Sequence, residues 1–323
     1  MRSMKLNKNF LLAISFLVLS VLLTSCGKSE ETIGKNKEIN IGYQKSGTTL
    51  LLKNKQELQK ELEKEGYKVT WSEFNTGSSI LEALNAGSID FAVAGDIPSI
   101  FALEKGSSFK YIASEPSSPS SEGILVRKDS KIKSLEDLKG KRIAFNKASI
   151  AQYLLTKALN SVGLSINDIE AVYLNPPEAS IAFEQGKVDA WVVWDPYMTV
   201  AESKGNNILK DASGIVPYRT YYFSTSELTK EHPEIIKKFI KHLANAGKQI
   251  NEDPTEAAML LQKTTNIPEG TWKKVLKKKK SDVQFMDEKA VHDLQEEADD
   301  LLKIGLIKKK VQIEEHVWYP EKK

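Results

Sequence analysis

Hydrogen-bond donors and glycines gather in four short polar segments, each of which follows an apolar, strand-like run. Such segments can surround an oxyanion with N–H and O–H groups, and glycine lets backbone N–H groups approach it closely. The four histidines all lie in the carboxyl-terminal third of the chain, so the segments indicate binding rather than catalysis by a histidine base. We expect these residues to contact a ligand: Gln44, Lys45 and Thr48; Thr76, Gly77 and Ser78; Gly95; Ser149 and Gln152.

Aromatic side chains follow a further apolar run and offer contact to the organic part of a ligand. Trp194 and Tyr197 come directly after this run, whereas Trp191 points to the opposite face because side chains alternate along a strand. We expect Asp195 to cap the helix that follows and to lie beside the ligand. Arg219 is expected to meet an anion when two parts of the protein close around it.

Two acidic residues, Asp96 and Glu115, stand close to the donor segments. A carboxylate repels an anion, so these residues either cap helices, orient donors, or receive an amine on a zwitterionic ligand. The donor residues also have an ordinary structural explanation, because Ser, Thr and Gly are common at the starts of helices. Trp194 and Tyr197 in turn have the alternative of packing against the next helix.

The elements that position these residues are short β-rich runs alternating with helix-period segments from residue 39 to residue 222. This alternation is typical of mostly parallel sheets with crossover helices, in which ligands bind outside the carboxyl ends of the strands. After residue 232 the pattern is helical throughout, over residues 233–251, 254–263, 269–280 and 288–303. We therefore predict an α/β, two-lobed fold.

The chain is expected to cross between the lobes twice, near residues 123–128 and 219–225. These crossings divide it into a first lobe of residues 38–125, a second lobe of residues 126–220, and a return to the first lobe over residues 221–323.

The amino terminus has the composition of an export signal. A basic, acid-free start precedes an apolar run at residues 10–23, and the single cysteine of the chain, Cys26, follows a Leu-Thr-Ser sequence. This pattern indicates a signal peptide of residues 1–25 and attachment of lipid to Cys26, which would become the first mature residue. Residues 26–37 are polar and suit a tether to the membrane. The alternative is an amino-terminal membrane helix, for which the run is short.

Charge and composition exclude several classes of function. The formal net charge of +3 comes from the three basic residues before the predicted cleavage point, so the mature chain is close to neutral. A nucleic-acid binder would carry a strong positive excess. The sequence contains no HExxH, GxSxG or P-loop motif and no cluster of cysteine and histidine. We therefore expect no catalysis, no metal and no cofactor.

Several segments together resemble a known family. They are Gly42–Lys45, Leu81–Val93, the stretch from Gly95 to Ala102, Ser134–Ala148 and Phe183–Met198. These residues resemble the aliphatic sulfonate-binding proteins of ABC importers, within a wider group that binds sulfonates, taurine, nitrate and thiamine precursors. The resemblance implies a periplasmic-binding-protein-like fold of type II and capture of an alkanesulfonate for uptake. It also implies a monomer, lipid-anchored on the extracytoplasmic face, that delivers its ligand to the permease subunits.

The sequence departs from the family pattern at Ser46, Thr48, Thr49, Ile97 and Ser99. These positions lie in the predicted ligand segments, so taurine, nitrate, a phosphonate or a thiamine precursor stays open as the ligand. A sulfonate has three acceptor oxygens and no proton to donate, which suits segments rich in donors. A lipoprotein that acts as a sensor or interaction module is the alternative from another class.

Overall fold

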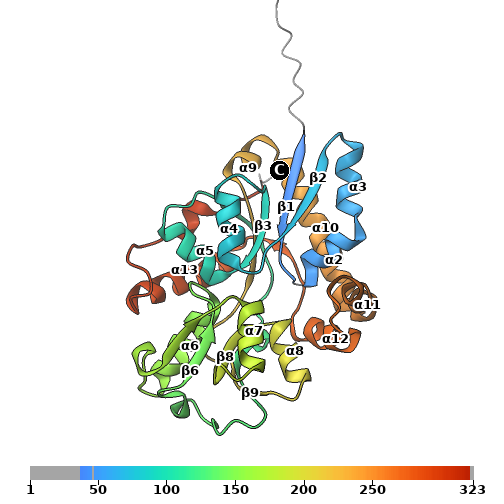
Figure 1. The fold of residues 1–323 in the computed structure, drawn as a ribbon. Helices are drawn as coiled ribbons and strands as arrows, with labels where there is room; N and C mark the ends of the chain where they lie inside the picture. Colours follow the sequence, from blue (N-terminus) through green and yellow to red (C-terminus); the bar gives the residue numbers. More distant parts are fainter. Residues whose placement is uncertain (1–36, 46, 321–323) are drawn as a thin grey trace, which may run out of the picture. The chain divides into compact units, whose positions relative to one another are not determined.

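Two mixed β-sheets flanked by helices carry the described part of the chain, residues 37–45 and 47–320, in this computed structural model (Figure 1). The expected signal peptide, Cys26 and the tether up to residue 36 lie outside the described residues, as does Ser46. From Glu38 onward the chain clusters as one compact unit. We call the two sheets with their helices the first and the second lobe.

The first lobe contains a six-stranded sheet in the order β11-β4-β10-β3-β1-β2. Its strands are β1 (Glu38–Tyr43), β2 (Lys68–Glu73), β3 (Phe91–Gly95), β4 (Lys110–Ser114), β10 (Thr220–Ser224) and β11 (Gln284–Phe285). Its helices are α2 (Gly47–Lys55), α3 (Glu57–Lys64), α4 (Gly77–Asn85), α5 (Asp96–Glu104), α9 (Ser226–Glu231), α10 (Pro233–Glu252), α11 (Pro254–Thr265), α12 (Glu269–Lys278) and α13 (Glu288–Lys303). A 3-10 turn, η4 (Ile313–His316), follows α13.

The second lobe contains a five-stranded sheet in the order β7-β6-β8-β5-β9. Its strands are β5 (Glu122–Val126), β6 (Arg142–Phe145), β7 (Glu170–Tyr173), β8 (Ala190–Trp194) and β9 (Asn207–Asp211). Its helices are α6 (Ile150–Ser161), α7 (Pro176–Glu184) and α8 (Tyr197–Ser203), with 3-10 turns η1 (Pro119–Ser121), η2 (Glu136–Leu138) and η3 (Ile166–Asp168).

The two sheets share one strand order. In the first lobe, β1 lies between β2 and β3, and a reversed strand lies between β3 and β4. In the second lobe, β6 lies between β7 and β8, and a reversed strand lies between β8 and β9. The reversed strand is β10 in the first lobe and β5 in the second, and each is the strand by which the chain arrives from the other lobe. Most strands of each sheet therefore run in one direction, as the sequence predicts, and the sheets are mixed because of the crossing strands and, in the first lobe, because of β11, which is antiparallel to β4.

The two crossing segments are residues 115–121 and 212–219, because β5 and β10 already belong to the sheets that they enter. The crossings thus lie a few residues earlier in the chain than the sequence suggests. They also hold one another: the Glu115 N–H donates to the Thr220 carbonyl at 2.9 Å, and the Ser118 N–H donates to the Tyr218 carbonyl at 2.9 Å. A paired connection of this kind suits a hinge.

Apolar side chains from both faces of the sheets form the core. Phe91 of β3 stacks on Phe239 of α10, with ring centroids 4.1 Å apart. Trp191 of β8 is buried against Phe183 of α7, so it belongs to the core. Burial of such aromatic surface is a large favourable contribution to folding.

One helix predicted as continuous is two helices. The sequence favours a single helix over residues 50–65, but α2 ends and α3 begins at Gln56, whose φ of 59° is left-handed. Glutamine carries no strong preference for that conformation, so the break has no local sequence signal. Leu50 and Leu51 of α2 pack with α11 and α12, whereas Leu58 and Leu62 of α3 belong to the main core, so tertiary packing favours the bend.

Candidate ligand-binding site

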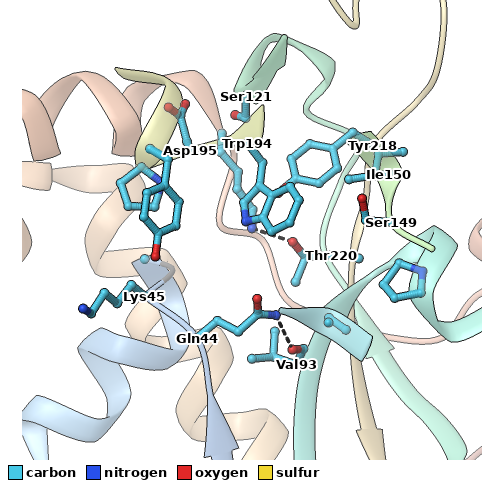
Figure 2. A pocket seen from close by; sticks show the side chains of 18 of the residues that line it. Gln44, Lys45, Val93, Ser121, Ser149, Ile150, Trp194, Asp195, Tyr218 and Thr220 are labelled. Atoms are coloured by element: carbon cyan, nitrogen blue, oxygen red, sulfur yellow. Dashed lines mark hydrogen bonds between the residues drawn. The ribbon is translucent and has the colours of Figure 1, made fainter. Parts of the chain in front are cut away.

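A cavity of about 80 Å³ lies where the carboxyl ends of strands from both lobes meet (Figure 2). We call it the interlobe cavity. Both lobes, the two crossing segments and the end of α12 contribute to its wall. Its lining residues are Gln44, Lys45, Gly47, Phe74, Asn75, Gly77, Val93, Ala94, Gly95, Pro98, Ser121, Ser149, Ile150, Trp194, Asp195, Pro196, Tyr197, Tyr218, Thr220, Val275 and Lys279.

On the first-lobe side, the wall is built from the ends of β1, β2 and β3. The side chain of Gln44 lies across this wall because its Nε2 donates to the Val93 carbonyl at 2.9 Å (Figure 2). Gly77 is the first residue of α4, and the start of a helix leaves backbone N–H groups without partners inside the helix. A side chain there would not fit, since a Cβ on Gly77 would lie 2.6 Å from Cγ of Pro98.

On the second-lobe side, Ser149 and Ile150 stand at the start of α6. The turn before them is tight, with Ala148 at a φ of 52°. Gln152 stabilises it because its Oε1 accepts from the Ala148 N–H at 2.7 Å, and Ser149 Oγ donates to the Asn146 carbonyl at 2.6 Å. Gln152 therefore shapes the cavity wall without lining it.

Aromatic rings supply the apolar part of the wall. Trp194 and Tyr197 come from the end of β8 and the start of α8, Tyr218 from the second crossing segment, and Phe74 from the loop after β2. Figure 2 shows Trp194 and Tyr218 on one side of the cavity and Gln44 on the other. Burial raises the pKa of Tyr197 to about 12, so its hydroxyl stays a neutral hydrogen-bond donor at physiological pH.

The predicted acidic residues nearest the cavity, Asp195 and Glu115, are already engaged. Asp195 caps α8, since its Oδ1 accepts from the Thr199 N–H at 2.9 Å and the Thr199 hydroxyl at 2.6 Å. Its Oδ2 faces Lys278 Nζ at 3.4 Å. Burial raises the pKa of Asp195, and Lys278 opposes that rise. Glu115 forms an ion pair with Lys279. The lining therefore combines donors and rings with acids whose charges have partners.

Eight of the predicted ligand residues line the interlobe cavity: Gln44, Lys45, Gly77, Gly95, Ser149, Trp194, Asp195 and Tyr197. The structure places the other seven behind the wall: Thr48, Thr76, Ser78, Asp96, Glu115, Gln152 and Arg219. Thr76 caps α4 by accepting from the Ser79 N–H at 3.2 Å, and Thr48 donates to Glu115 at 2.7 Å. Ser78 Oγ donates to the Ala148 carbonyl at 3.4 Å, which joins the two lobes beside the cavity.

Arg219 and Asp96 form a buried polar cluster away from the cavity. Asp96 accepts from the backbone N–H of Arg219 at 2.8 Å, and burial raises the pKa of Asp96 to about 6. The Arg219 guanidinium donates to Asp293 at 2.6 Å and to the Glu115 carbonyl at 3.3 Å. The positive charge of Arg219 is thus paired with Asp293 inside the protein, and in this arrangement the guanidinium does not face the interlobe cavity.

Sequence reasoning missed several lining residues. Phe74 and Asn75 come directly before the predicted donor segment of Thr76, Gly77 and Ser78, so their position after β2 could have indicated them. Ser121 lies in the Ser/Pro-rich crossing segment, and its buried hydroxyl has no hydrogen-bond partner within the described part of the protein. Lys279 had no sequence signal, because it stands in a run of four lysines at the end of a helix.

The described residues provide neither a metal site nor a membrane-spanning helix. Over residues 37–45 and 47–320, no group of three or more His, Cys, Asp or Glu side chains is arranged to hold a metal ion. Within that same part of the chain, no helix is long and apolar enough to cross a membrane.

Two α/β lobes, joined by paired crossing segments and enclosing a cavity at their strand ends, define the fold of the two-lobed periplasmic-binding-protein class. The chain belongs to the NMT1/THI5-like family, whose model matches residues 62–257.

Comparison with known proteins supports this assignment. The chain is 35% identical over 284 residues to a putative aliphatic sulfonates-binding protein of Escherichia coli, covering 87% of this chain and 89% of that protein. It is 34% identical over 301 residues to a protein of the same description from Bacillus subtilis, covering 92% and 91%. The alkanesulfonate-binding protein SsuA of Xanthomonas axonopodis pv. citri, solved with MOPS, superposes with a TM-score of 0.81 at 33% identity, covering 87% of this chain and 98% of that one.

Proposed function

We propose that this protein is the extracytoplasmic solute-binding component of an ABC importer and captures aliphatic sulfonates for uptake as a sulfur source. Support comes from its similarity, over most of its length, to two proteins described as aliphatic sulfonates-binding and to a solved alkanesulfonate-binding protein. The same similarity favours a binding protein over an enzyme.

One observation carries the proposal from the site itself: the cavity presents an unused donor beside an aromatic wall. Ser121 is buried, its hydroxyl lacks a partner within the described residues, and it lines the same cavity as Trp194 and Tyr218. Buried polar groups are rarely left unpaired, so a ligand acceptor is expected at Ser121. A sulfonate supplies three acceptor oxygens for such donors, and its alkyl tail suits the rings.

The engaged carboxylates favour a plain alkanesulfonate over taurine. The ammonium of taurine needs an acceptor with an unsatisfied negative charge. Asp195 faces Lys278, Glu115 faces Lys279, and Asp96 accepts from two backbone N–H groups. Glu122 has no partner within the described residues, but burial raises its pKa well above the usual value, which favours its neutral form. An amine would therefore have to displace one of the contacts above, so we expect taurine to bind more weakly than an alkanesulfonate of similar length.

The predicted ligand residues that line the cavity would bind the ligand directly in this proposal, with Ser121, Tyr218 and Thr220 added to them. The predicted residues behind the wall would shape it. Closure of the lobes about the paired crossing segments would bury the anion, and contacts across the cavity, such as Ser78 with the Ala148 carbonyl, would stabilise the closed form.

Lipid attachment at Cys26 is the second part of the proposal. The basic start, the apolar run and the single cysteine support a lipid-anchored protein on the extracytoplasmic face that works as a monomer with permease subunits. Replacement of Cys26 by serine should abolish incorporation of labelled palmitate into the protein without changing ligand binding. Labelling of the Cys26→Ser variant to the level of the wild type would contradict lipid attachment at this residue.

A thermal-shift panel on the full-length protein in a non-ionic detergent tests the ligand. We expect methanesulfonate and butanesulfonate to raise the unfolding temperature, since a ligand that binds only the folded state stabilises it. Taurine, methylphosphonate, nitrate, sulfate and a thiamine-type pyrimidine should give smaller shifts. A larger shift with any member of the second group than with both sulfonates would overturn the assignment.

A further inference from the structure

The carboxyl-terminal return places one lysine at the interlobe cavity. Lys279 follows the end of α12 in an extended conformation, with φ of −122° and ψ of 131°, and its side chain is 19% exposed. Its Nζ donates to Oγ1 of Thr220 at 2.8 Å, and both residues line the cavity (Figure 2, dashed at Thr220). An ammonium group, which water normally hydrates strongly, is therefore held in a largely buried position at the interlobe cavity.

A buried carboxylate holds Lys279 in position. The Glu115 side chain is fully buried and forms an ion pair with Lys279 through Oε2. Its other oxygen, Oε1, accepts from Thr48 at 2.7 Å and from the Tyr222 hydroxyl at 2.6 Å. An isolated buried charge is costly, so Glu115 and Lys279 each require the other. Glu115 therefore fixes both the place and the charge of the ammonium group.

The segment around Lys279 is held by a close approach of two backbones. Gly247 of α10 lies against the Ser281 carbonyl, and a Cβ on Gly247 would lie 1.9 Å from that oxygen. The Ser281 N–H also donates to Asn251 at 3.0 Å. These contacts fix the chain two residues after Lys279, which limits how far its side chain can withdraw from the cavity.

Lys279 has one donor left for a ligand. An ammonium group carries three N–H donors; Thr220 accepts from one of them, and Glu115 faces the group as an ion pair, so at least one N–H is left for a ligand. Of the described residues that line the cavity, the one other cation is Lys45. Lys45 is 38% exposed and pairs with Glu73 at 3.3 Å, so water screens its charge. A charge-assisted hydrogen bond from the less exposed Lys279 is expected to be the stronger contact.

We propose that Lys279 determines specificity for an anionic head group by donating its third N–H to a ligand oxygen, and that Glu115 is the positioning residue that holds it there. This inference rests on the proposed function of the same cavity, and it assigns the electrostatic contact to the carboxyl-terminal return rather than to Arg219 or Lys45.

A matched set of variants tests the inference by calorimetric titration with methanesulfonate. The Glu115→Gln/Lys279→Met double variant removes the buried pair without leaving an unpaired charge, so it should fold. Its affinity should fall on the order of 10- to 100-fold, the usual effect of losing a hydrogen bond to a charged group. Lys279→Arg should lose less because it keeps the charge, and Lys280→Met, which alters an exposed neighbour, should bind like the wild type.

Two results would overturn the inference: a double variant that binds methanesulfonate as the wild type does, or a Lys280→Met variant that loses as much affinity as the double variant. A crystal structure of the unaltered protein with methanesulfonate decides the matter even if the double variant does not fold. A sulfonate oxygen within about 3.2 Å of Lys279 Nζ supports the contact, and a larger separation contradicts it. Failure of the wild type to bind methanesulfonate would instead reject the proposed function.

Discussion

The ion pair between Lys278 and Asp195 fastens α12 of the first lobe to the turn that carries Trp194 in the second. Lys278 Nζ lies 3.4 Å from Asp195 Oδ2 and donates to the Thr199 hydroxyl at 2.7 Å. The two side chains are 22% and 5% exposed. At an effective dielectric constant of about 20, two unit charges at that separation attract by about 5 kcal/mol before desolvation is subtracted.

The two ends of this pair should respond differently to mutation. Lys278→Met leaves the buried Asp195 charge unpaired, so it should lower the free energy of unfolding by about 3 kcal/mol or more. Asp195→Asn should cost less, about 1–2 kcal/mol, because the more exposed Lys278 can turn to water or to Glu202. Glu202 already lies 3.9 Å from Lys278 Nζ. In the double variant the costs should overlap, with a coupling energy of about 1–3 kcal/mol.

Urea unfolding of the full-length protein, followed by tryptophan fluorescence, measures these free energies. The pair of Glu269 and Lys273, 2.6 Å apart on the surface of α12 with side chains about one third exposed, is the matched control. Its Glu269→Gln variant should cost less than about 1 kcal/mol. Additive effects of Lys278→Met and Asp195→Asn would refute the idea that these residues act as a buried pair.

The pH dependence gives a second check on the same pair. Burial holds the pKa of Asp195 above its usual value, so the folded state binds a proton at pH values where the unfolded state does not, and stability from this group falls as the pH rises. Removal of Lys278 raises that pKa further. The destabilisation by Lys278→Met should therefore be smaller at acidic pH, where Asp195 is protonated, than at pH 7.

Three further predictions concern the cavity and its supports. Trp194→Ala should lower the affinity for butanesulfonate about 10- to 50-fold more than the affinity for methanesulfonate, since each buried methylene contributes about 0.8 kcal/mol. An equal loss of affinity for both ligands in calorimetry would show that the ring does not contact the tail. Gly247→Ala should lower the free energy of unfolding by about 1–3 kcal/mol and weaken methanesulfonate, whereas Gly270→Ala, whose Cβ would meet nothing within 4 Å, should do neither. Glu122 is fully buried, both of its carboxylate oxygens lack a partner within the described residues, and burial raises its pKa well above the usual value. Wild-type stability should therefore fall as the pH rises through that pKa. Glu122→Gln should make the fall measured by urea unfolding at pH 5–9 smaller, and the part that comes from Asp96, whose pKa is also raised, should remain.

The elements with strong local signals were predictable from the sequence. Helices α10 and α11 begin at Pro233 and Pro254, as expected from proline in the first turn. Because apolar residues recur at helical spacing in both segments, the predicted carboxyl-terminal ends of these helices agree with the observed ends to within about two residues. The caps at Thr76 and Asp195 were likewise readable, because a short polar side chain before a helix accepts from its free N–H groups.

Contacts made over long sequence distances were not predictable. The helix expected to run to Lys280 ends at Lys278, and this change turns Lys279 towards Thr220 and Glu115. Nothing local distinguishes Lys279 from the lysines beside it, because its partners lie 59 residues or more away in the chain. For Arg219 the error is the reverse. Its position in the sequence predicts a place at the cavity, but α13 packs nearby and its Asp293 accepts a hydrogen bond from the guanidinium instead.

Calorimetric titration of the unaltered full-length protein with butanesulfonate tests the central claim most directly. We predict saturable binding of one butanesulfonate per chain, with higher affinity than sulfate, nitrate or taurine measured under the same conditions. No saturable heat with butanesulfonate, or tighter binding of any of the three other anions, would contradict the assignment of the interlobe cavity to aliphatic sulfonates.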